Sequence, residues 1–337
     1  MPAPASRKRH ALRATGLLVS LGILLLVCVA SIAVGAKPVP LSDVWHGLFH
    51  NSGVGNDVII HDVRVPRTLL GLLAGAALGL AGAVMQALTR NPLAEPGLLG
   101  VNAGASAAVV SAISFLGVTS LTGYVWFAFL GAAVVSALVY VLGGSRSATP
   151  VRLALAGTAA TAALYGYINA VQLLDSAALD RLRFWTVGSL ASADMETIGK
   201  VWPFIAIGVV LALLLARPLN AMEMGDDTAR SLGAHLSRTR VLSMLAVTLL
   251  CGAATAACGP IIFVGLMIPH LVRFITGPDM RWILPYATVL SPVLLLGSDV
   301  VGRVVTRPSE LQVGIVTALI GGPVFICLVR RKRMAQL

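Results

Sequence analysis

The chain contains few charged residues. Asp, Glu, Lys and Arg make up 12% of its 337 residues, and only 14 residues are acidic. A soluble globular domain carries roughly twice that charged fraction, so the composition excludes an ordinary soluble protein. Aromatic residues reach only 6%, and the 4 cysteines form neither a CxxC pair nor a zinc-ligand pattern. We therefore expect the cysteines to be packing residues.

Motifs of catalysis and nucleotide binding are also missing. No acid/base or nucleophile cluster is present, and without a GxxxxGK[ST] motif any ATP would have to be bound by another subunit. Few ionisable residues lie within apolar stretches, which disfavours an ion-coupled carrier because such carriers use buried charges. His46 and His50 have a metal-compatible spacing, but an amphipathic helix on the membrane surface is the plainer interpretation, and no metal is expected.

The sequence is instead rich in hydrophobic residues, at 57%. Long charge-free stretches predict membrane-spanning helices, because one crossing takes about 20 apolar residues. Residues 96–145 contain a turn-like segment and predict two crossings, whereas 241–273 are interrupted at Gly259-Pro260 and predict a full helix followed by a short one. The ten expected spans lie at 14–36, 68–89, twice within 96–145, 153–174, 201–216, 241–258, 261–273, 282–298 and 311–329.

The distribution of Lys and Arg predicts the orientation. An even number of spans places both termini on one side, and most of the 25 Lys and Arg residues fall in inner loops if that side is the cytoplasm. We expect a basic cytoplasmic N-terminus at 1–13, one ten-helix domain at 14–330 and a cytoplasmic tail at 331–337. A cleaved signal peptide is the alternative for the N-terminus, but the apolar run exceeds the usual length of such peptides.

Two spacings predict how the helices pack. Gly71, Gly75 and Gly79 recur every four residues, a stripe of small residues that lets helix backbones approach closely in lipid. Asp299 precedes Arg303 by four residues, the favourable order for a helical ion pair. The pair is expected either to anchor the outer end of its span or to leave Arg303 facing a partner.

The longest expected cytoplasmic loop, 217–240, contains the signals of a short helix. Two acidic residues suit its N-terminus, and Gly233 suits the left-handed residue that ends it. The expected helix has about two turns and presents Ala229 and Leu232 as a small apolar face beside Arg230. It could dock on a partner or lie on lipid, and the residues alone leave both open.

Several arginines stand on the outer side, where the positive-inside rule disfavours them. Arg64 and Arg67 directly precede one expected span, and Arg303 follows another. Arginine suits carboxylate pairing, so these residues predict contact with an acidic partner surface, with phospholipid headgroups as the alternative.

Five segments carry recognisable motifs. They are RVPRTL at 64–69, GLAGAVMQ at 79–86, TRNPLAEPGLLG at 89–100, GPIIFVGLMIPH at 259–270 and GIVTALIGGP at 314–323. Together they resemble the FecCD permease family, the membrane subunits of bacterial ABC importers for ferric siderophores, haem and cobalamin. Further segments look most like the subgroup of permeases for ferric enterobactin. One departure is Gln312, where many relatives have Pro.

The resemblance implies roles that spacing does not. It implies a bundle like that of the cobalamin-importer permease, which docks on a cytoplasmic ATPase dimer through a coupling segment. Carried over, that segment is Ala229, Arg230, Leu232 and Gly233.

The resemblance also implies a docking site for a binding protein and a translocation pathway. Arg64, Arg67 and Arg303 are expected to meet an extracytoplasmic solute-binding protein. Residues expected near the translocation pathway are Thr158, Thr161, Tyr165, Asn169 and Thr317.

The expected protein is thus an all-α permease of the bacterial cytoplasmic membrane, without enzymatic activity or cofactor of its own. It is expected to pair with a second permease, as a homodimer or heterodimer, and to carry a ferric siderophore. Cobalamin or haem is the alternative cargo, and an ion-coupled carrier the remote alternative. The net charge of +11 reflects topology and docking, so no nucleic-acid partner is expected.

Overall fold

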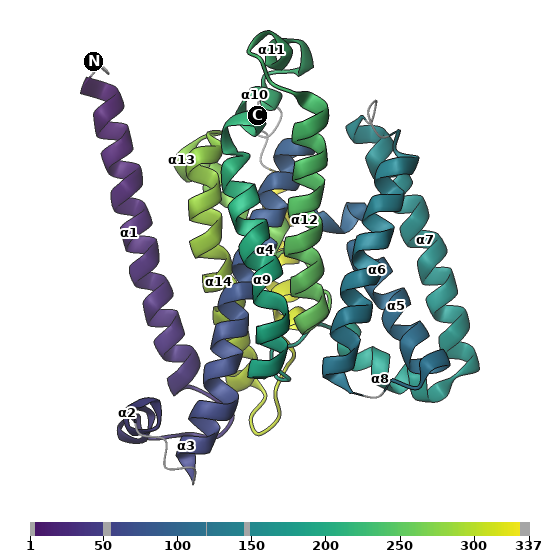
Figure 1. Ribbon diagram of the computed structural model, residues 1–337. Coiled ribbons are helices and arrows are strands. Elements are labelled where there is room, and N and C mark those ends of the chain that lie inside the picture. Colours follow the sequence, from purple (N-terminus) through teal and green to yellow (C-terminus); the bar gives the residue numbers. More distant parts are fainter. Residues whose placement is uncertain (1–3, 50–54, 119, 145–148, 331–337) are drawn as a thin grey trace.

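The computed structural model describes residues 4–49, 55–118, 120–144 and 149–330, and every regular element within them is helical (Figure 1). This confirms the all-α prediction. A helix lies in each of the ten segments expected to span the membrane. The ten are α1 (Pro4–Ala33), α4 (Val65–Thr89), α5 (Val101–Leu116), α6 (Leu121–Leu142), α7 (Pro150–Leu174), α9 (Met195–Leu214), α12 (Leu236–Cys258), α13 (Val264–Thr276), α14 (Met280–Val305) and α15 (Val313–Arg330).

Within the part of the chain that the structure describes, seven helical regions are long and apolar enough to cross a membrane, namely those that contain α1, α4, α6, α7, α9, α12 and α14. The helices α5, α13 and α15 are apolar but shorter. Length and composition therefore make the chain a multi-pass membrane protein.

The remaining elements are short and lie at the ends of the long helices. A short helix is present where the amphipathic helix was expected, with Val44 buried and Trp45 exposed, and its place on a membrane surface stays a prediction. The short elements are α2 (Leu41–Phe49), α3 (Asn56–Val58), the π-helix η1 (Ile59–Arg64), the 3-10 helix η2 (Pro96–Leu99), α8 (Ser176–Thr186), α10 (Ala216–Glu223) and α11 (Asp226–Ser231).

Capping side chains explain where several helices begin. Asp194 accepts a hydrogen bond from the backbone N–H of Thr197 at 2.6 Å, and Asp279 accepts one from Arg281 at 3.1 Å. Each bond satisfies an N–H that has no partner inside the helix. At the other end, α5 stops at Gly117, whose φ of 65° is the left-handed conformation that glycine adopts readily.

The helix α4 runs through the middle of the bundle and contacts α9, α12, α13 and α14 (Figure 1). Its stripe of small residues, Gly71, Gly75 and Gly79, makes the contact with α14 close, and Gly82 beside the stripe does the same for the contact with α13. A Cβ atom added at Gly75 would lie 2.6 Å from the Cα of Pro292, and one added at Gly82 would collide with the carbonyl of Gly265. The close helix packing predicted from the glycine spacing is confirmed.

The helices α5, α6, α7 and α8 form a second group beside this core, drawn in teal in Figure 1. It joins the core mainly where α6 packs on α12. The helix α7 lies at the free edge of the group, and Leu155, Leu173 and other large apolar side chains on it are exposed.

Several helices extend beyond the expected spans, most at the start of α1 (Pro4, expected at 14) and at the end of α14 (Val305, expected at 298). The helix α13 is shifted instead, from the expected 261–273 to Val264–Thr276. The chain leaves α12 at Gly259, and Phe263 precedes α13 with a left-handed φ of 69°. The Gly259-Pro260 pair locates an interruption of the helix but cannot locate the residue at which helical hydrogen bonding resumes.

Candidate functional site

The short helix expected in the cytoplasmic loop is α11. Gly225 precedes it and Gly233 follows it, both with positive φ, at 106° and 80°. The predicted left-handed glycine at its end is confirmed. Ala229 and Leu232 do not share an outer face, however, because Ala229 is 0% exposed and Leu232 is 63% exposed. Arg230 also points into solvent, so the surface available to a partner is Leu232, Arg230 and Gly233.

Asp226 attaches α11 to the bundle. One carboxylate oxygen pairs with Arg90 at the end of α4, and the other accepts a bond from Arg240 of α12 at 2.7 Å. Burial by itself would raise the pKa of Asp226, but the bonds to Arg90 and Arg240 outweigh it and hold the pKa below its usual value. The carboxylate therefore stays ionised and ties α11 to α4 and α12.

A cavity of about 470 Å³ lies beside this attachment. Arg13, Arg90 and Arg273 line it together with Glu223 and Asp279. Burial raises the pKa of the Glu223 carboxyl, although Arg273 lies 3.6 Å away and opposes the shift. This end of the bundle is thus an arginine-rich region whose charges are largely balanced by acidic neighbours.

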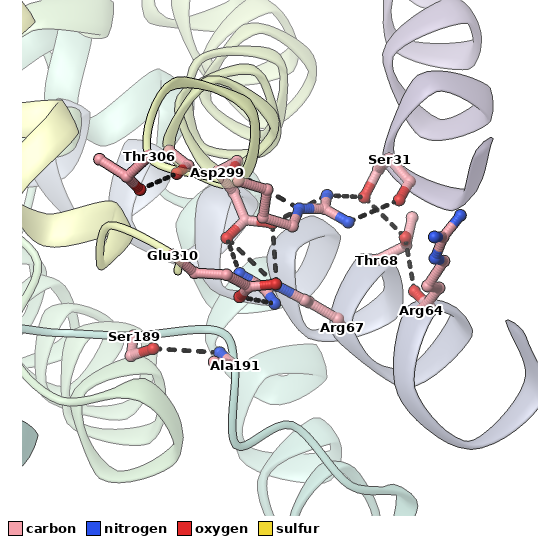
Figure 2. Close-up of polar contacts among 11 residues, drawn as sticks. Ser31, Arg64, Arg67, Thr68, Ser189, Ala191, Asp299, Thr306 and Glu310 are labelled. Atoms are coloured by element: carbon pink, nitrogen blue, oxygen red, sulfur yellow. Dashed lines mark hydrogen bonds and ion pairs between the residues drawn. The ribbon is translucent and has the colours of Figure 1, made fainter. Parts of the chain in front are cut away.

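At the other end of the bundle, the outer arginines are buried. Arg67 is 5% exposed and lies between Asp299 and Glu310, with N–O distances of 2.7 Å to each, as Figure 2 shows. Arg303 pairs with the same Asp299 at 2.9 Å, which confirms the predicted i,i+4 ion pair. We call Arg67, Asp299, Arg303 and Glu310 the outer charge cluster.

Arginines also hold the C-terminal end of α1. Arg64 donates to the carbonyl oxygens of Ile32 and Ala33 at 2.8 Å, and Arg303 donates to that of Ser31 at 2.9 Å. The last carbonyls of a helix have no partner within it and carry partial negative charge, so they suit guanidinium groups. The predicted role of Arg64, Arg67 and Arg303 in docking a binding protein stays a prediction, but the structure already gives each of them an internal partner.

The residues expected along the pathway lie in two places. Thr158, Tyr165 and Asn169 are on the exposed face of α7, and Thr161 is half-buried beside them. Thr317 of α15 is buried and donates to the carbonyl of Gly314 at 3.0 Å. Of these five residues, Tyr165 lines a cavity of about 530 Å³. Residues from several elements share this lining, among them Asn102, Pro260, Gly314 and Leu319.

Residue patterns missed several members of these sites. Glu310 directly precedes the expected span at 311–329, and its pairing was not predicted. An acid close to outer arginines is itself a signal for such pairing. Arg90 and Glu95 lie within the motif at 89–100, but their spacing alone indicates no partner for either of them. Of the histidine pair, His46 lies 3.2 Å from Asp57, and His50 lies outside the described residues.

Comparison with known proteins agrees with this architecture. A family model described as the FecCD transport family matches residues 23–331. The chain is 48% identical over 316 residues to the ferric enterobactin transport system permease protein FepD of Escherichia coli K12, covering 92% of this chain and 94% of FepD. It is 36% identical over 319 residues to the hemin transport system permease protein HmuU of Yersinia pestis, with 92% and 94% covered.

A solved structure gives the same result at the level of the fold. It is described as a metal-chelate type ABC transporter in an inward-facing conformation, and it superimposes with a TM-score of 0.83 at 27% sequence identity. The alignment covers 95% of this chain and 99% of that one. With the helical fold, the match to the family model and the near full-length relatives, the chain belongs to the FecCD transport family of multi-pass membrane permeases.

Proposed function

We propose that the chain is the permease subunit of a bacterial ABC importer that carries a ferric siderophore across the cytoplasmic membrane. The observation that carries this proposal is the 48% identity to a ferric enterobactin permease over nearly the whole of both chains. The permease performs no bond chemistry and binds no cofactor of its own, since ATP is bound by the partner ATPase.

The importer works by alternating access. A cytoplasmic ATPase dimer docks on the coupling segment formed by Ala229, Arg230, Leu232 and Gly233 and moves it during the ATP cycle. The exposure of Leu232 supports this role, as does the attachment of α11 through Asp226 to α4 and α12. A displacement of α11 then acts directly on two long helices.

The topology has ten spans with both termini in the cytoplasm. The segment 1–13 is a cytoplasmic N-terminus, 14–330 is the transmembrane domain with its coupling loop at 217–240, and 331–337 is a cytoplasmic tail. In support, the N-terminal end of α1 lies at the same end of the bundle as α11 (Figure 1), and Arg13 of α1 lines a cavity together with Arg90 and Glu223.

A second permease, identical or related, packs against the chain so that the pathway runs between them. The exposed apolar and polar side chains of α7 support this, because such a face suits a protein partner or a lined pathway. Thr158, Thr161, Tyr165, Asn169 and Thr317 are the residues that we place near the cargo.

The extracytoplasmic binding protein docks at the outer ends of α4 and α14. Arg64, Arg67 and Arg303 shape this surface, and Glu310, whose side chain is 32% exposed, is the member of the outer charge cluster most open to a partner. We therefore expect the arginines to act on docking largely by positioning the loop that carries Glu310.

Haem is a second candidate cargo, favoured by the 36% identity to a hemin permease; cobalamin remains a third. The test is uptake by bacteria that lack their own permeases and express this chain with its cognate ATPase, second permease and binding protein. Ferric catecholates, ferric hydroxamates, haem and cobalamin are offered separately. Uptake of a ferric siderophore is expected, and uptake of haem or cobalamin alone would contradict the proposed cargo.

A further inference from the structure

The segment between α4 and α5 touches two distant parts of the molecule. At its start, the guanidinium of Arg90 pairs with Asp226 of α11 and donates to the carbonyl of Met222 at 2.8 Å. Five residues later, the Glu95 carboxylate accepts a hydrogen bond from the backbone N–H of Phe263 at 3.3 Å. Residues 90–95 therefore connect α11 to the non-helical segment between α12 and α13.

Both anchor points hold unusual backbone. Among the described residues, Arg90 and Phe263 are the two non-glycine residues with positive φ, at 49° and 69°. Side chains make this conformation unfavourable, and it persists where surrounding contacts impose it, often at switch regions. Here one of the two residues, Arg90, begins the segment 90–95, and the other, Phe263, is hydrogen-bonded to Glu95 at the end of that segment.

The segment itself is well held. Asn91 accepts bonds from the backbone N–H groups of Leu93 at 2.9 Å and Ala94 at 3.1 Å, and Pro92 and Pro96 restrict φ at their own positions. A segment with so few free torsions can transmit a displacement.

Phe263 lies against α15, the helix whose Thr317 we place near the pathway. Phe263 directly precedes α13, and a Cβ atom added at Gly321 of α15 would lie 2.5 Å from the Cβ of Phe263. A shift of Phe263 would therefore displace α13. It would also displace α15, because Phe263 packs directly against Gly321.

We propose that residues 90–95 form a coupling strut, in which Arg90 receives the displacement of α11 and Glu95 passes it to the start of α13 and to α15. Glu95 is thus a positioning residue for translocation. The inference rests on the proposed function, since it assumes that α11 is moved by an ATPase. The proposed role requires a side chain at position 95 that is long enough for its oxygen to accept the hydrogen bond from Phe263, and it does not require a negative charge.

The experiment uses the complete complex in proteoliposomes and measures ferric siderophore imported per ATP hydrolysed. Glu95→Gln keeps an acceptor oxygen at the same reach and is expected to preserve this ratio. Glu95→Asp is one methylene shorter and is expected to lower the ratio about tenfold while ATP hydrolysis continues, as for the loss of one hydrogen bond. The control is Glu196→Asp, which alters an outer surface pair with Lys200 and should leave the ratio unchanged.

Arg90 provides a second variant that does not depend on the folding of Glu95→Asp. Arg90→Lys keeps the charge beside Asp226 but lacks the Nε–H that bonds Met222, so it should also lower the ratio. A wild-type ratio in either Glu95→Asp or Arg90→Lys overturns the proposal, as does a loss in Glu95→Gln equal to that in Glu95→Asp. Absence of ATP-dependent uptake by the wild-type complex would instead contradict the proposed function.

Discussion

Single residues of the outer charge cluster show how buried charge is balanced. Arg67 and Arg303 share Asp299, and Glu310 completes a cluster of two positive and two negative groups. Taking such groups out of water is costly, and their mutual attraction compensates only while every partner is present. The cluster therefore makes the contact among α4, α14 and the loop before α15 sensitive to any one of its members.

Replacing Asp299 by Ala tests this balance. Two buried guanidinium groups would then face each other without their shared carboxylate, and we expect a loss of about 3–5 kcal/mol in stability. The apparent melting temperature of the purified permease in detergent measures it. Glu196→Ala removes an exposed pair and should cost no more than about 1 kcal/mol. Equal losses in the two variants would contradict the structural role of the cluster.

Asp226 predicts a pH dependence of the attachment of α11. Its pKa is lower in the folded protein, so its stabilisation is complete above its unfolded pKa of about 3.9 and is lost as the pH falls through the folded value. Protease cleavage within 225–235 should therefore increase below about pH 4 in the wild type. In Asp226→Asn it should be high at neutral pH and vary little. A pH-independent wild type would contradict this interpretation.

At the scale of elements, α11 carries one buried apolar side chain, Ala229, and is followed directly by an exposed one, Leu232. Ala229 fixes the helix against the bundle, and Leu232 is left free for a partner. The two positions therefore allow docking and folding to be separated by the same type of substitution.

Leu232→Asp is expected to abolish uptake while the protein still accumulates in the membrane, because a charge replaces an exposed apolar docking group. Ala229→Asp is expected to reduce accumulation itself, because it buries an unpaired carboxylate. Immunoblots of membrane fractions, read beside uptake assays, distinguish the two effects. Unimpaired uptake by Leu232→Asp would count against the docking assignment.

The packing of α4 on α14 makes a further prediction. Gly75→Leu would drive a side chain into the backbone of Pro292 and should lower stability by about 1–3 kcal/mol or more. Gly22 of α1 has no atom within 4 Å of an added Cβ, so Gly22→Leu is a matched control that should be tolerated. Melting temperatures in detergent compare the two variants, and equal stability would contradict the close α4–α14 contact.

At the scale of the whole molecule, the fold was largely predictable from sequence. Charge-free stretches locate helices because lipid excludes charge, and the glycine stripe and the Asp299–Arg303 pair follow from helical periodicity. Local patterns cannot reveal the pairing of Arg67 with Asp299 or of Arg90 with Asp226, because these contacts join residues far apart in the chain. Nor does an apolar pattern show that Ala229 faces inward while Leu232 faces outward.

The central claim is ATP-driven import of a ferric siderophore, and transport in proteoliposomes tests it most directly. The permease is reconstituted with its second permease, ATPase and binding protein, and uptake of a radiolabelled ferric siderophore is followed. We predict accumulation that requires both ATP and the loaded binding protein and that persists when proton and sodium gradients are collapsed. Accumulation driven by an ion gradient without ATP would contradict the account.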